Sequence, residues 1–235
     1  MNLDEGIRFL ADGGLNLVAV LDGTALPEQT KQLIVRSKIP LNDYKRLMVI
    51  GHGGRRLWEA LETRGMIHAD PVDHYSVSLT GQFIRDYLGS PPVFWLYPST
   101  RYLVPLQQLG EAAGWSFPSP LGSGISPRYG AWFAYRTAFL INTDLPLRRE
   151  DLASSPCDSC KKKPCIGACP ADAVQWASLD IDSCARHRLH PESPCADRCL
   201  ARLACPLSPE HRYTRSQIQY HYRRSLETIR AWHDK

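Results

Sequence analysis

The distribution of the cysteines constrains this chain more than any other feature. All eight lie between positions 157 and 205, and the first 156 residues contain none. The N-terminus is acidic and lacks an apolar stretch, so it does not read as a signal peptide, and we expect the chain in the cytoplasm. The cytosol keeps thiols reduced. A dense group of thiols in that compartment indicates metal binding rather than disulfides.

The spacing of the thiols defines two sets, and both end in a cysteine that precedes a proline. A [4Fe–4S] cube needs one thiolate for each iron, and in two-cluster ferredoxins the cysteine before proline serves the other cluster. This exchange divides the eight thiols between two [4Fe–4S] clusters. The first cluster takes Cys157, Cys160, Cys165 and Cys205. The second cluster takes Cys169, Cys184, Cys195 and Cys199.

Zinc is the main alternative to iron–sulfur at these thiols. Two all-thiolate zinc sites would also use eight cysteines, and C-x2-C is a common zinc half-site. Two Cys–Pro endings do not follow from zinc, which favours iron–sulfur. The segment Lys161–Pro164 lengthens the first loop beyond the standard ferredoxin spacing, so a [3Fe–4S] site stays open. His187 and His190 could replace a thiolate, although the eight cysteines suffice.

Composition excludes several classes of protein. Hydrophobic residues make up 43% and charged residues 22% of the chain, as in ordinary globular proteins. No apolar run reaches the ~18 residues that a membrane span requires, so we expect no membrane contact. The formal net charge of +4 is too small to argue for nucleic acid.

Hydrophobic periodicity predicts a layered α/β or α+β domain ahead of the cysteines. We expect helices over 4–11, 55–64, 73–88, 104–113 and 216–232, and strands over 15–21, 45–50, 92–97 and 132–142. Asp73 and Gly89 are the expected caps of one helix, and Gly51–Gly54 reads as a turn. The expected domains are an α/β core over 1–150, a ferredoxin-like iron–sulfur module over 151–210, and a C-terminal helix over 211–235 that packs on the core.

A family resemblance appears just before the cysteines. The chain reads AGWSFP at 113–118, SPRYGAWF at 126–133 and LINTDLP at 140–146, followed by the thiols. This order resembles the epoxyqueuosine reductases. The resemblance implies a nitroreductase-like core that binds cobalamin, with two ferredoxin-like clusters that pass electrons to cobalt. It therefore implies an oxidoreductase that depends on iron–sulfur clusters and on cobalamin.

The same segment contains the candidate cobalamin residues. Glycines let a backbone approach a large flat ligand, and aromatic side chains supply apolar walls. From the residues alone, the aromatic side chains could instead fill a core. The resemblance favours cobalamin contacts, and the residues concerned are Gly114, Trp115, Phe117, Pro127, Tyr129, Gly130 and Trp132.

Two departures from the family pattern bear on the substrate. The family has a proton-donating aspartate at a fixed spacing before the glycine that corresponds to Gly114. At that spacing this chain has Thr100. We also expect the family's tRNA-engaging repeat domain to be missing. We therefore expect an enzyme that is not a true epoxyqueuosine reductase, with tRNA an unlikely partner, and we assign no catalytic residue.

The expected partners follow from the redox chemistry. They are an electron donor, such as a flavodoxin, a ferredoxin or a reductase, and either cobalamin itself or a small-molecule substrate. The alternative function is a ferredoxin-like electron carrier without a substrate of its own.

Overall fold

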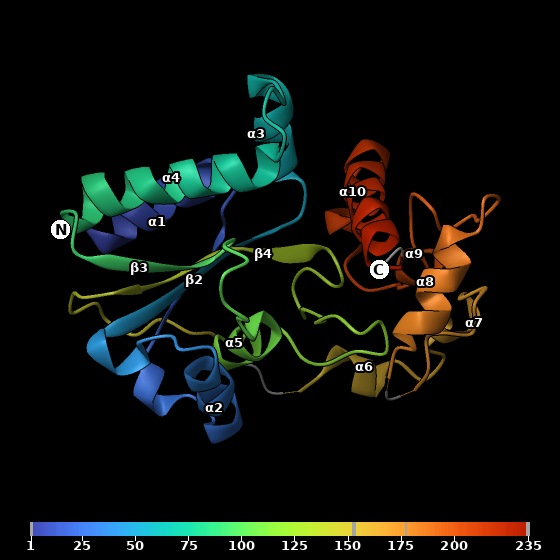
Figure 1. Ribbon diagram of the computed structural model, residues 1–235, viewed down its shortest axis with the longest axis horizontal. Coiled ribbons are helices and arrows are strands. Elements are labelled where there is room, and N and C mark those ends of the chain that lie inside the picture. Colours follow the sequence, from blue (N-terminus) through green and yellow to red (C-terminus); the bar gives the residue numbers. More distant parts are fainter. Residues whose placement is uncertain (1, 152–153, 177, 234–235) are drawn as a thin grey trace. The chain divides into compact units, whose positions relative to one another are not determined.

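The chain forms two compact units in a computed structural model that describes residues 2–151, 154–176 and 178–233. The first unit comprises 1–116 and 133–152, and the second comprises 117–132 and 153–235. Figure 1 shows the elements of both units. Among the described residues, no helix combines the length and hydrophobicity that a bilayer span requires.

A four-stranded sheet forms the centre of the first unit. Its strands lie in the order β1-β2-β4-β3, and every neighbouring pair is antiparallel. An antiparallel sheet with helices identifies the α+β class, rather than a parallel α/β arrangement. The strands are β1 (Leu17–Leu21), β2 (Arg46–Gly53), β3 (Val93–Tyr97) and β4 (Phe133–Ile141).

Five α-helices among the described residues accompany this sheet. Figure 1 shows α1 and α4 over one face of the sheet, with α2 and α5 on the opposite side. Gly6 lets α1 and α4 approach closely, because a Cβ there would lie 2.6 Å from a ring carbon of Phe83. The helices are α1 (Leu3–Asp12), α2 (Glu28–Arg36), α3 (Arg56–Arg64), α4 (Pro71–Leu88) and α5 (Leu106–Ala112).

The two ends of α4 can be compared with the capping residues that the sequence predicts. Gly89 ends the helix in the left-handed conformation, with φ 78°, as expected. The N-cap residue is Asp70, so the expectation of Asp73 was wrong. Pro71 occupies the first helical turn, where its fixed φ suits the helix and its missing N–H removes no hydrogen bond. The helix therefore begins before Asp73.

The second unit contains mostly short helices. The C-terminal helix α10 packs on α8 through Arg188, whose guanidinium donates to Ser225 Oγ at 3.0 Å and to the Tyr222 carbonyl at 2.8 Å. A small cluster of Trp132, Tyr213 and Ile218 is buried there. The helices are α6 (Pro156–Ser159), α7 (Pro164–Gly167), α8 (Ile181–Leu189), α9 (Leu200–Leu203) and α10 (Arg215–His233).

The second unit includes one segment that lies ahead of the expected boundary at residue 150. Residues 117–132 belong to the unit that contains the cysteines, although the chain returns to the first unit at Phe133. This segment folds back on itself through antiparallel bridges between Phe117 and Ile125 and between Ser126 and Gly130. The same division places α10, which was expected as a separate helix packing on the core, in the second unit.

Candidate metal centres

Four thiols line a cavity of about 250 Å³ in the second unit. Two of them lie on short helices that begin with proline. Ser155 caps the helix of Cys157, because its Oγ accepts from the Cys157 N–H at 3.2 Å. Pro164 begins the helix of Cys165. The four thiols are those of Cys157, Cys160, Cys165 and Cys205.

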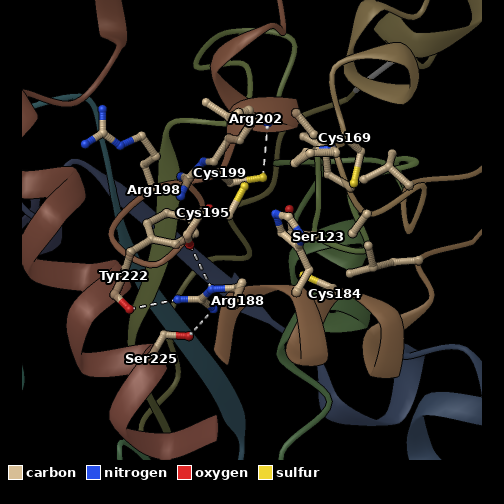
Figure 2. Close-up of a pocket in the computed structure, with 18 of the residues that line it drawn as sticks. Ser123, Cys169, Cys184, Arg188, Cys195, Arg198, Cys199, Arg202, Tyr222 and Ser225 are labelled. Carbon is tan, nitrogen blue, oxygen red and sulfur yellow. Dashed lines mark hydrogen bonds between the residues drawn. The ribbon is translucent and has the colours of Figure 1, made fainter. Parts of the chain in front are cut away.

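A second cavity in the same unit has a volume of about 380 Å³. Figure 2 shows its thiols together with the cationic side chains around them. Cys184 projects from α8, while Cys199 is the N-cap of α9, with its Sγ accepting from the Arg202 N–H at 3.4 Å. The four thiols are those of Cys169, Cys184, Cys195 and Cys199.

The two Cys–Pro thiols lie apart from their neighbours in sequence. Cys169 follows Cys165 closely along the chain but lines the second cavity, whereas Cys205 follows Cys199 but lines the first. The structure thus groups the thiols in the same two sets of four as the ferredoxin-type exchange. The role of these thiols as cluster ligands stays a prediction.

The separation of the thiols bears on what each cavity could hold. In the described part of the chain, no three His, Cys, Asp or Glu side chains converge as a single metal ion would require. A zinc ion bonded to sulfur at about 2.3 Å would bring its sulfurs within about 4 Å of one another. The thiols instead surround cavities, which fits a polynuclear cluster in which each thiolate binds its own iron.

The fold matches solved structures, although no protein-family model and no curated protein sequence matches the chain. Epoxyqueuosine reductase from Streptococcus thermophilus is 10% identical, with a TM-score of 0.55 over 88% of this chain and 66% of that one. The Bacillus subtilis enzyme, solved with the catalytic loop of its aspartate swung out of the active site, is 16% identical, with a TM-score of 0.56 over 90% and 66%. An epoxyqueuosine reductase bound to a modified tRNA-Tyr stem loop is 14% identical, with a TM-score of 0.59 over 92% and 68%.

The chain has the fold of the epoxyqueuosine reductases. This finding confirms the resemblance that the sequence indicated. The chain spans about two thirds of the length of each of these proteins. The tRNA-bound neighbour gives no support to the expectation that tRNA is an unlikely partner.

Burial raises the pKa of several of these thiols. Desolvation raises the pKa of Cys184, the nearby Cys199 raises it further, and Arg188 lowers it. Desolvation also raises the pKa of Cys195 and of Cys157, and Lys163 opposes the effect at Cys157. Because a bound metal cation stabilises the thiolate, these sites favour metal over an empty, charged state.

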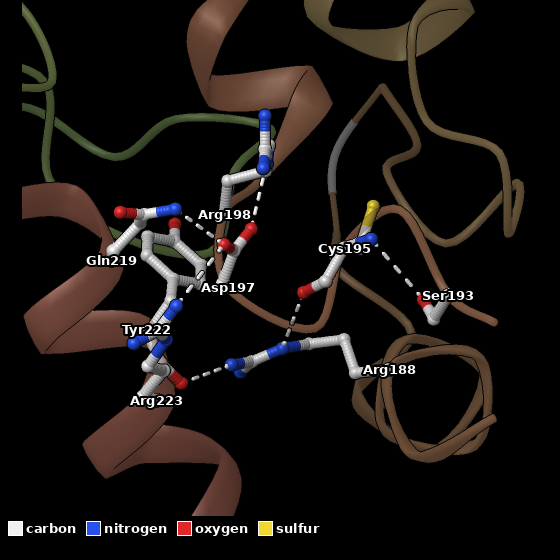
Figure 3. A network of polar contacts seen from close by, with 8 residues as sticks. All are labelled: Arg188, Ser193, Cys195, Asp197, Arg198, Gln219, Tyr222 and Arg223. Carbon is white, nitrogen blue, oxygen red and sulfur yellow. Dashed lines mark hydrogen bonds and ion pairs between the residues drawn. The ribbon is translucent and has the colours of Figure 1, made fainter. Parts of the chain in front are cut away.

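The two cavities differ in the cations that line them. Arg188, Arg198 and Arg202 line the second cavity. Figure 3 shows how two of them are held: Arg188 donates to the Cys195 carbonyl at 3.2 Å, and Arg198 pairs with Asp197 at 2.7 Å. The first cavity has Lys163, whose Nζ donates to the Cys157 carbonyl at 2.8 Å.

The aromatic residues expected to contact cobalamin are mostly buried among the chain's own side chains. Trp115 belongs to the first unit and stacks with Tyr135 at 6.2 Å between ring centroids. Trp132 is 1% exposed in the second unit, where it packs edge-on against Tyr213 at 5.4 Å. Tyr129 is also buried, Pro127 is exposed, and Phe117 borders an open groove. The core-filling alternative therefore describes Trp115 and Trp132.

The two candidate glycines approach backbone rather than open space. A Cβ on Gly114 would overlap the carbonyl oxygen of Glu150, and one on Gly130 would lie 2.6 Å from the carbonyl oxygen of Leu207. Both have positive φ, of 72° and 58°. These close approaches require glycine at both positions whether or not a ligand binds. Packing within the chain therefore accounts for Gly114, Gly130, Trp115 and Trp132, and these four residues do not form the expected slot for cobalamin.

A buried polar cluster in the first unit was missed by the sequence analysis. His52 is fully buried on β2, and its Nδ1 accepts from Arg136 Nε on β4 at 3.0 Å. Asp73 on α4 lies 4.0 Å from Arg136, and its pKa is raised by burial against the opposing charge of that arginine. Burial also raises the pKa of Tyr97 on β3. The strand order β2-β4-β3 places His52, Arg136 and Tyr97 on neighbouring strands, and α4 adds Asp73.

The expected turn over Gly51–Gly54 and the position of Thr100 can also be compared with the structure. Residues 51–53 belong to β2, so the expected turn over Gly51–Gly54 begins only after Gly53. Thr100 is exposed in the loop that follows β3.

Proposed function

We propose that this chain is a cytoplasmic iron–sulfur oxidoreductase whose second unit holds two [4Fe–4S] clusters. One observation carries the proposal: the eight thiols lie in two sets of four around two cavities, and each set includes the Cys–Pro thiol of the other run. The clusters would supply one-electron transfer when bound.

The residues of the second unit would hold the thiolates and exclude water. Ile125, Pro206 and Leu207 line the first cavity, and Val174, Leu179 and Ala201 line the second. These apolar side chains limit access of solvent to the sulfurs. The nearby arginines and Lys163 offset the negative charge that four thiolates bring to each site.

An electron donor would dock beside the first cavity. An open groove of about 510 Å³ contains Cys157, Lys163 and the 69% exposed Trp176. Lys163 Nζ lies 4.1 Å from the centre of the Trp176 ring, and Lys161 and Lys162 are exposed next to it. A cationic surface of this kind steers acidic partners, so we propose a small acidic flavodoxin or ferredoxin, or a reductase, as donor.

The acceptor of the electrons is the finer part of the proposal. The resemblance of the sequence to the epoxyqueuosine reductases implies a corrinoid-dependent reductase, or a protein that processes cobalamin reductively. Thr100, at the position where the family pattern has its aspartate, supports a substrate other than epoxyqueuosine. The burial of Trp115 and Trp132 favours the second candidate, an electron carrier without a substrate of its own.

Anaerobic reconstitution tests the proposal. We expect about eight iron and about eight sulfide per chain, with the broad absorbance of [4Fe–4S] clusters. Stoichiometric zinc without sulfide would refute it. Titration of the reconstituted protein with cobalamin then separates the two candidates, because only a corrinoid-dependent protein should perturb the cobalamin spectrum. Incubation with epoxyqueuosine-modified tRNA should give no turnover.

A further inference from the structure

The imidazole of His187 carries a buried nitrogen without a partner. Four buried side-chain atoms in the described part of the chain have no hydrogen-bond partner, and a buried polar atom without one costs free energy. Only one of the four belongs to a residue that lines a thiol cavity, namely His187 at the second cavity. The four atoms are Trp132 Nε1, His187 Nε2, Arg212 Nε and Gln217 Oε1.

The helix α8 places His187 on the same side as a thiol. Cys184 and His187 are three positions apart on this helix, so their side chains share one face. The helix is fixed at its start by Asp180, whose carboxylate accepts from the Ser183 N–H at 3.0 Å. The next residue, Arg188, ties the helix to α10. The position of the His187 ring is therefore set by a helix held at both ends.

The cationic groups around the second cavity already have partners. Arg188 donates to the Cys195 carbonyl at 3.2 Å, to Ser225 and to the Tyr222 carbonyl. Arg202 donates to the Ala131 carbonyl, and Arg198 is paired with Asp197. Among the described residues, His187 Nε2 is thus the buried side-chain nitrogen of this cavity that has no hydrogen-bond partner.

The first cavity lacks an equivalent group. Apart from its cysteines, the polar side chains among the described residues that line it are Ser159 and Lys163. Ser159 Oγ donates to the Pro156 carbonyl at 3.1 Å, and Lys163 Nζ donates to the Cys157 carbonyl at 2.8 Å. The two cavities are therefore asymmetric in their available hydrogen-bond donors.

We propose that His187 donates a hydrogen bond from Nε2 to a sulfur of the group held by the second set of thiols. This inference rests on the proposed iron–sulfur function. A reduced cluster carries one more negative charge, so an N–H donor stabilises the reduced form more than the oxidised form. His187 therefore raises the reduction potential at the second set, and electrons that enter beside Cys157 pass toward it.

The test is a redox titration of reconstituted protein followed by electron paramagnetic resonance. His187→Phe keeps a ring but removes the donor, and His187→Gln keeps an N–H near the position of Nε2. We expect a negative shift of the second-set midpoint potential in His187→Phe, a smaller shift in His187→Gln, and no shift of the first-set potential in either. His190→Phe on the same segment and Ser159→Ala at the first cavity are the controls and should shift neither potential.

Iron and sulfide content separate the outcomes. Wild-type potential in His187→Phe, with both clusters intact, overturns the role of His187 and leaves the proposed function standing. Loss of half the iron in His187→Phe also overturns it, because His187 would then be a ligand. Wild-type protein that takes up no cluster refutes the proposed function itself. The variant Cys184→Ala assigns the signals by removing a thiol of the second set.

Discussion

The two units of this protein are stabilised in different ways. The first is built on an antiparallel sheet whose strands β1, β2 and β4 are almost entirely buried. In the second, α6, α7 and α9 have four residues each, a length at which an isolated helix is unstable in water. These short helices carry or flank thiols. The first unit thus has a buried sheet as its core, and we predict that the second depends for its stability on what its thiols bind.

We expect the largest difference between the two units when metal is removed. Chelation of iron under anaerobic conditions should unfold much of the second unit and leave the first folded, because the free energy of metal binding contributes to the folding free energy of a unit with mostly short helices. Hydrogen exchange should show lost protection over 156–211 and retained protection in β2 and β4. Equal protection of 156–211 with and without iron would contradict the comparison.

The exchange of Cys–Pro thiols predicts which set each variant damages. Cys169→Ala should impair the second set and spare most of the first, because Cys169 lines the second cavity. Cys205→Ala is the matched variant and should do the reverse. Iron content and magnetic resonance spectra measure both effects. Loss of the first set in Cys169→Ala would show that each run of thiols closes on itself.

A core substitution tests the independence of the first unit. Phe139 is 0% exposed on β4, so Phe139→Ala should lower the free energy of unfolding of this unit by about 3–5 kcal/mol. Both cluster spectra should be unchanged at temperatures where the unit is folded. Leu103→Ala is the control, since Leu103 is 75% exposed and should change stability by less than about 0.5 kcal/mol. Denaturant unfolding followed by near-ultraviolet circular dichroism measures both.

Substitution of Gly130 gives the smallest predicted effect on stability, and it tests the loop beside the first set of thiols in the second unit. Gly130→Ala adds about 1–2 kcal/mol of backbone strain at φ 58°, together with a contact at 2.6 Å to the Leu207 carbonyl oxygen. Leu207 lies just after Cys205, so the reconstituted first set should lose iron faster on heating. Gly167→Ala is the control, because nothing lies within 4 Å of its Cβ position. A larger side chain at Gly130 would disturb the same loop, so it would test packing rather than cobalamin binding.

The regular elements show which sequence signals were sufficient. The apolar run of β1 and the periodicity of α1 predicted both elements to within a few residues. The helix α2 was not predicted, since its buried positions are Thr30 and Ile34 and only one of them is apolar. The helix α8 was also missed, because its short sequence is rich in polar residues. Local patterns identify an element only where it buries an apolar face.

The sequence by itself determined the eight thiols, their two Cys–Pro endings, and most of the strands and helices of the first unit. It also carried the resemblance to epoxyqueuosine reductases, which the fold confirms. Only the tertiary structure decided which thiols share a cavity, that Trp132 fills a core, and that His52 meets Arg136. The reason is physical: spacing and periodicity describe neighbours along one element, whereas a cavity or a buried contact joins residues that only the path of the chain brings together.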